Sequence, residues 1–422
     1  MGEDGVCGAR PRPSARGAGA RSGAARTKKK GYHGATTACP LCRTAARCVA
    51  YREKSLVSLL GPLRVVRPYY HCATCGQGFC PWDAELGVQA GTLSPAAAEV
   101  ACVAGVQSSF AEASTKVLPK LAGLQLAEST GERTTEAAGL RLGAAQRAEE
   151  RGEAEQEWAW HRDAEGKTVA YVAVDATGVP QQGPAGGKAD SRMANVGVIY
   201  NPVPEDPTRW ATPAVGPKPT WQARYVASLE RMAELGPLVR QQGTAVGMER
   251  AERWIALSDG GSGLEECVHT HFPRVEVVIL DFYHAAEYLH DLAKAWAGAD
   301  TPGAAALGQQ WCHQLKHEGG QAVLRTLQGL DLRGRSATAR ECYQATVRYV
   351  TNHVHRMDYP TYRAKGWQIG SGPVESACKR VVGQRLKGAG MRWGEAGAEA
   401  LCRLRALFLS EPGSWDAFWS RN

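Results

Sequence analysis

Three short apolar runs, each followed directly by an aspartate, constrain the fold of this chain most strongly. They are rich in valine, isoleucine, leucine and alanine, and their length is typical of buried strands. The runs and their acids are residues 167–174 with Asp175, residues 254–258 with Asp259, and residues 275–280 with Asp281. Together they predict a sheet whose strands end in carboxylates.

The segments between these runs complete a mixed α/β pattern. Residues 194–200 and 210–221 are expected to form further strands, the second interrupted by prolines, and residues 224–240 are expected to form an amphipathic helix. A long helical region follows over about 284–357. The fold class predicted for this part of the chain is therefore a mixed α/β sheet with a late helical segment.

Residues 370–393 place one carboxylate among many cations. Gly372 is expected to be the N-cap of a helix and Pro373 its first residue, which puts Glu375 in the first turn. The basic side chains that follow are Lys379, Arg380, Arg385, Lys387 and Arg392. Such a segment suits a site where metal ions meet a polyanion. The alternative is that Glu375 only interacts with the helix dipole.

Two strand-terminal aspartates and one helical glutamate form a set suited to hard divalent cations. Mg²⁺ prefers oxygen ligands, and two such ions about 4 Å apart stabilise the attacking and leaving oxygens of a phosphoryl displacement. Asp175 and Glu375 are two members of this set. The third is either Asp259, whose following glycines let the backbone approach a ligand, or Asp281, which is followed by His284. Either aspartate alone is also typical of a helix N-cap.

Two CxxC pairs near the N-terminus predict a zinc ribbon. The pairs are Cys39 with Cys42 and Cys72 with Cys75, and 29 residues separate them. Strands expected over 48–60 and 64–71 form a hairpin between the pairs, with a Gly-Pro turn. Four thiolates arranged in this way are typical of a closed, structural Zn²⁺ site. The alternatives are four free thiols or a redox CxxC, which would not need a second pair.

Residues 93–150 are expected to be helical and to resemble a helix-turn-helix. Helices are predicted from residue 94 to 106, from 109 to about 121, and again after residue 127. The last helix would present Ser129, Thr130 and Arg133 to a DNA groove. The alternative is a helical linker without a nucleic-acid partner.

Charge and composition agree with a DNA partner and exclude some other classes. The 422 residues carry a formal net charge of +8, and residues 1–30 form a basic tail that is expected to be disordered and to contact nucleic acid. The alternative is a solvated tail without a partner. No apolar run is long enough for a membrane span, and the N-terminus lacks the apolar core of a secretory signal. The 13 cysteines show no disulfide framework, so a reducing cytoplasm is expected, with the protein associated with the nucleoid.

Several short motifs along the chain match one family pattern. They are Asp175-Ala-Thr-Gly-Val-Pro180, Ser258-Asp-Gly260, Asp281-Phe-Tyr-His-Ala-Ala-Glu287, Gly370-Ser-Gly-Pro-Val-Glu-Ser-Ala-Cys-Lys379, Val382-Gly-Gln-Arg-Leu-Lys387, Gly390-Met-Arg-Trp393 and Trp415-Asp-Ala-Phe-Trp419. Taken jointly, they resemble bacterial insertion-sequence transposases of the ISKra type, which are related to Mutator-like transposases. The resemblance spans residues 35–420 and leaves the N-terminal tail aside.

The resemblance implies a ribonuclease-H-like core with a DDE triad. It orders the triad as Asp175, Asp259 and Glu375, holding Mg²⁺ or Mn²⁺, and makes Asp281 and His284 an auxiliary motif. It also implies a helical insertion over about 285–360. The expected domains are a basic tail (1–34), a zinc ribbon (35–90), a helical DNA-binding unit (91–157) and a catalytic domain (158–422).

The function expected from the resemblance is metal-dependent cleavage of DNA ends followed by strand transfer. The expected partners are the ends of the element and a target DNA, with Arg133 and the basic residues after Glu375 on phosphates, and a homo-oligomer on paired ends. Two alternatives remain open at this point. One is a nuclease with the same core but no strand transfer, and the other is a zinc-ribbon DNA-binding protein with an inactive core.

Overall fold

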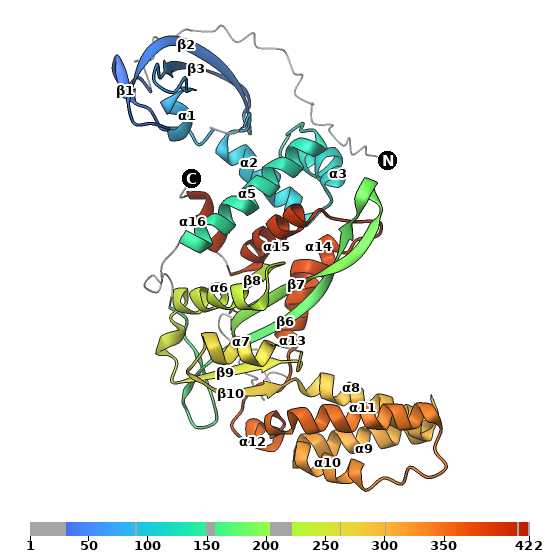
Figure 1. Cartoon of the computed structure of the whole chain (residues 1–422). Coiled ribbons are helices and arrows are strands. Elements are labelled where there is room, and N and C mark those ends of the chain that lie inside the picture. The colour runs from blue at the N-terminus through green and yellow to red at the C-terminus, as the bar shows by residue number, and fades with distance from the viewer. Residues whose placement is uncertain are drawn as a thin grey trace, which may run out of the picture. The chain divides into compact units, whose positions relative to one another are not determined.

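The structure is a computed structural model, and it describes residues 31–88, 91–148, 157–202, 222–261, 263–299, 301–411 and 413–420 (Figure 1). The chain divides into two compact units. The first comprises Met1–Leu56 and Leu63–Thr92, and the second comprises Val57–Pro62 and Leu93–Asn422. The helices expected over 91–157 therefore belong to the same compact unit as the strands that precede Asp259 and Asp281.

The N-terminal unit contains a small antiparallel sheet. Its strands, in spatial order, are β1 (Thr36–Ala38), β2 (Ala45–Ser58), β3 (Gly61–His71) and β4 (Gly78–Phe79), followed by α1 (Pro81–Glu85). Strands β2 and β3 are the hairpin expected between the cysteine pairs. Gly61 has a φ of 105°, which favours glycine at this turn. The small core contains Tyr70 and two of the cysteines, Cys39 and Cys72.

The second unit is built on a mixed sheet with the spatial order β10-β9-β6-β7-β8. Its strands are β6 (Thr168–Gln182), β7 (Lys188–Asn201), β8 (Gln222–Ser228), β9 (Arg253–Ser258) and β10 (Val275–Leu280), and the short β5 (His161–Arg162) pairs with β6. Strand β7 is antiparallel to β6 and β8, whereas β9 is parallel to β6 and β10 is parallel to β9. The prediction of a mixed α/β sheet is confirmed.

Two expectations about the first strands of this sheet were wrong in position. Strand β6 does not end at Asp175, because its pairing with β7 continues to Gln182 opposite Lys188. Residues 222–228 form β8 rather than the start of a helix, because they pair along their whole length with β7. Helix α6 (Met232–Ala245) begins only after this strand. The strand expected over 210–221 lies outside the described residues.

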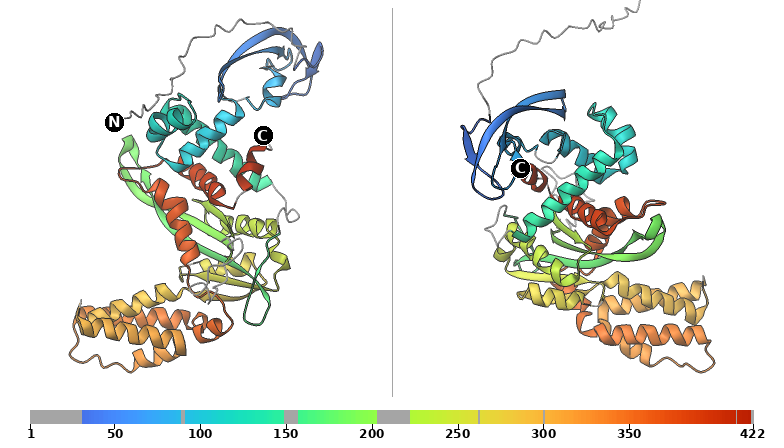
Figure 2. Two further views of the ribbon diagram at one scale, coloured as in Figure 1. Left: turned by 180° about the vertical axis from the view of Figure 1, so that it is seen from behind. Right: turned by 45° about the horizontal axis from the view of Figure 1, so that its top comes forward.

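Helices cover both faces of the sheet (Figure 1, Figure 2). Helices α6 and α7 (Leu264–His271) pack on the face that carries Val172 and Trp254. The opposite face carries Ala173 and Leu257 and packs against α8, α13 and α15. Alternate residues of β6 therefore enter two separate cores, as expected of a strand buried on both sides.

A helical bundle follows β10, as the sequence predicted. Its helices are α8 (Phe282–Ala297), α9 (Pro302–Glu318), α10 (Gly320–Gln328), α11 (Ala337–His353) and α12 (Tyr359–Ala364). The chain then returns to the sheet as α13 (Gly372–Ala377), a π-helical turn (Cys378–Gly383) and α14 (Gln384–Leu386), which run beside β6 and β7 (Figure 1). Helices α15 (Glu395–Leu409) and α16 (Ser414–Ser420) follow.

The helices expected after residue 93 are present and pack on the C-terminal helices. They are α2 (Pro95–Gln107), α3 (Phe110–Glu112), α4 (Leu118–Leu121) and α5 (Glu128–Ala148). Helix α5 crosses α15 closely, and a Cβ atom placed on Gly139 would lie 2.2 Å from the carbonyl oxygen of Ala400. Ser129 and Arg133, at the start of α5, are exposed. No helix among the described residues has the length and apolar character needed to cross a bilayer.

Two buried arginines join the end of α2 to the C-terminal part of the chain. Arg385 Nε donates to Gly105 O at 2.7 Å, and Arg405 Nη1 donates to Val106 O. Both arginines are almost fully buried. The last carbonyl groups of a helix carry partial negative charge and lack partners within the helix, so a cation is stabilising there.

Candidate functional site

The register of the parallel strands brings Asp175 and Asp259 to the same level of the sheet. Ala173 on β6 lies opposite Leu257 on β9, and each aspartate follows two residues later. Ala173 and Leu257 belong to the same core, so they mark one face of the sheet. Because side chains alternate along a strand, the two aspartates are directed to that face as well. Their electrostatic repulsion contributes to a raised pKa of Asp175, after the larger effect of burial.

Asp281 lies beside Asp259 at the end of the next strand. Leu280 is opposite Ser258, and Asp281 N donates to Ser258 O at 2.9 Å. The three aspartates of the apolar runs are thus neighbours on adjacent parallel strands, although Asp175 lies within β6 rather than at its end.

Glu375 reaches the same place from α13. This helix begins one residue earlier than expected, because Ser371 rather than Gly372 is its N-cap. Burial raises the pKa of Glu375, and repulsion by Asp281 and Asp175 raises it further, although a hydrogen bond from Ser371 Oγ at 2.8 Å opposes this. Electrostatic repulsion therefore acts between Asp175 and Asp259, and between Glu375 and both Asp281 and Asp175.

Asp281 and Asp259 differ in how many partners they have. Asp281 is fully buried and accepts backbone N–H groups of Tyr283, His284 and Ser371 at 3.0–3.2 Å. It is therefore the N-cap of α8 and also tethers the start of α13. Asp259 is partly exposed and accepts only the N–H of Gly261, at 2.8 Å, among the described residues. Asp259 thus retains more free oxygen lone pairs for a ligand.

The carboxylates suit divalent cations in their chemistry. Within the described ranges, Asp175, Asp259, Asp281 and Glu375 form no ion pair with lysine or arginine, so their negative charge is not neutralised by the protein. Like charges held together without a cation favour binding of Mg²⁺ or Mn²⁺, which take oxygen ligands. Among the described residues, however, no three of these acids bring one oxygen each within 4.8 Å of one another. The set fits a wider arrangement, such as one spanning two ions.

A pocket of about 350 Å³ opens beside Asp175 and Glu375. Lys379 and Lys387 line the same pocket and are exposed. Lys387 Nζ donates to Thr177 Oγ1 at 2.5 Å, which holds the ammonium group close to β6. Acids and exposed lysines in one pocket are the groups needed to hold metal ions and phosphates respectively.

The structure separates the predicted DNA-binding residues into two groups. Arg133, Lys379, Arg380, Lys387 and Arg392 have exposed side chains. Arg385 corrects the prediction, because it is only 2% exposed and its guanidinium group lies 4.7 Å from the ring centroid of Phe110 and 5.0 Å from that of Trp393. A phosphate has no access to it. A basic run on a helix does not reveal by itself which of its members faces inward.

His284 lies near the acids on the first turn of α8. Its Nδ1 is 3.4 Å from Glu287 Oε2, and a protonated ring would interact favourably with Asp175. Its ring also contacts Tyr288 and Tyr349 edge-on. The role of His284 as an auxiliary residue stays a prediction.

Two further residues of the site were not predicted. Cys378 donates its thiol to Asp175 Oδ2 at 3.4 Å, and Tyr349 donates its hydroxyl to Asp259 O at 2.9 Å. Cys378 lies three residues after Glu375, so helical spacing offered a signal for it. Tyr349 lies on α11 within a long helical region, where no local pattern distinguishes it.

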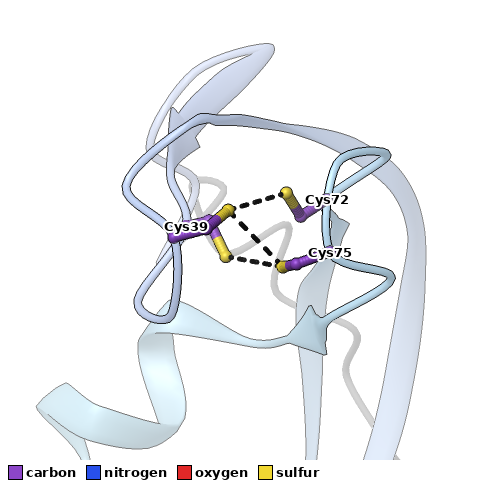
Figure 3. Close-up of side chains that lie close together, drawn as sticks. Cys39, Cys72 and Cys75 are labelled. Carbon is purple, nitrogen blue, oxygen red and sulfur yellow. Dashed lines mark hydrogen bonds between the residues drawn. The ribbon is translucent and has the colours of Figure 1, made fainter.

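The four cysteines of the two CxxC pairs come together as predicted. Figure 3 labels three of them, Cys39, Cys72 and Cys75. One sulfur atom from each lies within 4.8 Å of the others, and the closest sulfur pairs are 3.5–3.6 Å apart. A tetrahedral zinc site with four thiolates has sulfur atoms about 3.8 Å apart, from a Zn–S distance of about 2.3 Å. A hydrogen bond with Thr44 lowers the pKa of Cys72 to about 5 and so favours the thiolate. The cluster is consistent with a structural zinc site, and neither Cys48 nor Cys80 belongs to it.

Comparison with known proteins provides no family for this chain. No protein-family model matches it, and a search of the curated proteins finds no match. Function is therefore inferred from the residues of the chain and from their geometry.

Proposed function

We propose that this protein is a DDE transposase that cuts the ends of a DNA element and joins them to a target. The observation that carries the proposal is the convergence of Asp175, Asp259 and Glu375, from two parallel strands and one helix, with no lysine or arginine ion pair to them in the part of the chain that the structure describes. The sheet, with three antiparallel and two further parallel strands, supports a ribonuclease-H-like core.

Asp175, Asp259 and Glu375 would hold the two divalent cations in this core. When bound, such ions activate a water or a 3′-hydroxyl group and stabilise the leaving oxygen. Other residues of the protein would hold these carboxylates in place. Ser371 orients Glu375 through its hydroxyl, and Asp281 fixes the backbone of Ser371. A phosphodiester would first be hydrolysed to release a 3′-hydroxyl, which would then attack the target DNA.

The basic residues around the pocket would bind the DNA backbone. Lys379 and Lys387 line the pocket, and Arg380 and Arg392 are exposed on the same segment. Contacts with phosphates provide affinity that depends on salt but little on sequence. Recognition of the element ends would fall to the zinc ribbon and to the exposed start of α5, with Arg133 on the DNA. Assembly on paired ends would require a homo-oligomer.

A cleavage and joining assay tests the proposal. The full-length protein is incubated with Mg²⁺, a target plasmid and a labelled duplex that carries the DNA flanking the reading frame. We expect cleaved and joined products from the wild-type protein and neither from Glu375→Gln, with nearly unchanged binding to the duplex. Glu395→Gln is a matched control, because Glu395 also lies in the first turn of a helix but is remote from the acids in its ion pair with Arg192.

The outcomes separate the alternatives. Cleavage without joined product would favour a nuclease without strand transfer. Binding without either reaction would favour a DNA-binding protein with an inactive core. Joined product from Glu375→Gln would show that the triad is assigned wrongly.

A further inference from the structure

Three side chains from the end of the helical bundle hold the carboxyl ends of β9 and β10. They lie between residues 349 and 359, and each donates to a main-chain carbonyl oxygen. The bonds are Tyr349 Oη to Asp259 O (2.9 Å), Arg356 Nη2 to Ser258 O (3.3 Å) and Tyr359 Oη to Leu280 O (3.0 Å). We call Tyr349, Arg356 and Tyr359 the strand-end clamp.

Two of the three clamp residues are buried, whereas Tyr349 is partly exposed, and the clamp has several bonds to the same strand ends. Arg356 is 2% exposed and Tyr359 is fully buried. Arg356 also donates to Ser258 Oγ at 2.6 Å and to Val278 O at 3.2 Å, and Glu265 balances its charge. Ser258 O also accepts the backbone N–H of Asp281, so the side-chain donors add to the backbone hydrogen bonds that hold these strand ends.

The chain after Asp259 is rich in glycine, which gives its backbone little intrinsic rigidity. Asp259 is followed by glycines at 260, 261 and 263, and Gly260 has a φ of 88°. Glycine-rich backbone has many accessible conformations, so the turn alone fixes the carboxylate poorly. Tyr349 holds the peptide of Asp259 from outside the turn.

The position of Tyr349 is itself well determined. Its ring stacks on Tyr288 with centroids 4.0 Å apart and planes 11° from parallel. His353, one helical turn later, packs against both the ring of Tyr349 and the turn at Gly260. A hydroxyl group held in this way is a rigid donor rather than a mobile one.

We propose that the strand-end clamp positions Asp259 for a divalent cation, with Tyr349 as its positioning residue. The inference rests on the proposed function, because it assumes that Asp259 binds metal. According to this proposal, residues of the helical bundle help to set the geometry of the metal site.

Binding of Mn²⁺ to the full-length protein, followed by electron paramagnetic resonance, tests the clamp without DNA cleavage. Tyr349→Phe removes only the hydroxyl group and keeps the ring stack. We expect Mn²⁺ affinity to fall about two- to tenfold, the range expected for one hydrogen bond. Tyr343→Phe is the control, because Tyr343 lies on the same helix and its hydroxyl has no hydrogen bond to the described residues. Cleavage by Tyr349→Phe should recover at high Mn²⁺, which a loss of folding would not produce.

The possible results separate the clamp from the proposed function. Wild-type affinity in Tyr349→Phe would overturn the clamp alone. If Tyr349→Phe is poorly folded, Tyr359→Phe removes the bond to Leu280 O, and wild-type Mn²⁺ affinity in a folded Tyr359→Phe would equally overturn the clamp. No Mn²⁺ binding by the wild-type protein, or equal binding by Asp175→Asn, would overturn the proposed metal site and the clamp with it.

Discussion

The thiol of Cys378 donates a hydrogen bond to Oδ2 of Asp175 at 3.4 Å, across 203 residues of sequence. This contact joins the helical segment that carries Glu375 to the strand that carries Asp175. It also occupies one oxygen of a carboxylate that we assign to metal binding.

Substitution of Cys378 should have a much smaller effect than substitution of Asp175. A neutral thiol is a weak donor, so Cys378→Ala should reduce metal-dependent cleavage less than about tenfold. Asp175→Asn should reduce it by about two orders of magnitude or more, because a metal ligand is lost. Initial cleavage rates at saturating Mg²⁺ distinguish the two. A Cys378→Ala variant as inactive as Asp175→Asn would mean that the thiol itself takes part in the reaction.

Substitution of Asp281 should mainly reduce stability, whereas substitution of its neighbour Asp259 should mainly reduce activity. Asp281→Asn should lower the free energy of unfolding by about 1–3 kcal/mol, because Asp281 satisfies three buried backbone N–H groups. Asp259→Asn should leave stability nearly unchanged and abolish cleavage. Urea unfolding and cleavage assays on both variants check this. The opposite pattern would exchange the two roles.

The close crossing of α5 and α15 predicts opposite effects for two glycine substitutions on one helix. Gly139→Ala should destabilise the protein by about 1–3 kcal/mol, because the new methyl group would meet Ala400 O. Gly131→Ala, where nothing lies within 4 Å, should stabilise the protein by about 0.5–1 kcal/mol through helix propensity. Thermal unfolding of the two variants measures the difference. Equal melting temperatures would show that the helices do not approach this closely.

Protonation of Asp163 should lower the free energy of unfolding at acid pH. Burial alone would raise the pKa of its carboxyl group, but hydrogen bonds from Trp367 Nε1, the N–H groups of Lys167 and Glu165, and Arg253 outweigh burial and lower the pKa. A group with a lowered pKa in the folded state stabilises the protein above its unfolded pKa of about 3.9, and this stabilisation is lost as pH falls through the folded value.

Asp163→Asn measures this contribution. It should lower the free energy of unfolding by about 1–3 kcal/mol at neutral pH, and the difference from wild type should shrink below about pH 4. Asp291→Asn is the control, because Asp291 is an exposed acid whose ion pair among the described residues is with Lys294, also on α8. A difference that stays constant from pH 7 to pH 3 would contradict the assignment.

Removal of zinc should unfold the N-terminal unit alone. The purified protein should contain about one zinc per chain, and Cys39→Ser should lose it, whereas Cys48→Ser should keep it. Because the chain divides into two compact units, a chelator should increase hydrogen exchange over residues 31–88 and leave the sheet of the second unit protected. Undiminished zinc in Cys39→Ser would contradict the site.

Local patterns predicted the strands that precede Asp259 and Asp281, the helix that carries Glu375, although not its first residue, and the four-cysteine cluster. Each depends on residues close in sequence, such as an apolar run with its terminal acid or a CxxC pair. The end of β6 was not predictable in this way, because its length depends on pairing with β7 as far as Lys188.

Contacts between residues distant in sequence were also not predictable, because they depend on how separate segments pack together. Tyr349 and Cys378 reach the acids only because helices return to the sheet, 90 and 203 residues away from their partners. Arg385 was assigned to DNA because its neighbours are basic, yet Phe110 and Trp393 enclose it. The predicted roles of Asp175, Asp259 and Glu375 in metal binding stay predictions.

The buried arginines at the end of α2 have a consequence for biosynthesis. Arg385 and Arg405 are translated 280 and 299 residues after the carbonyl groups that they contact. A nascent chain therefore carries the end of α2 and the apolar face of α5 without their final partners for most of its synthesis. Residues 93–148 should stay open to water or to a chaperone until α15 has left the ribosome. A protein shortened before Arg405 should consequently lose the order of these early helices, although their own sequence would be intact.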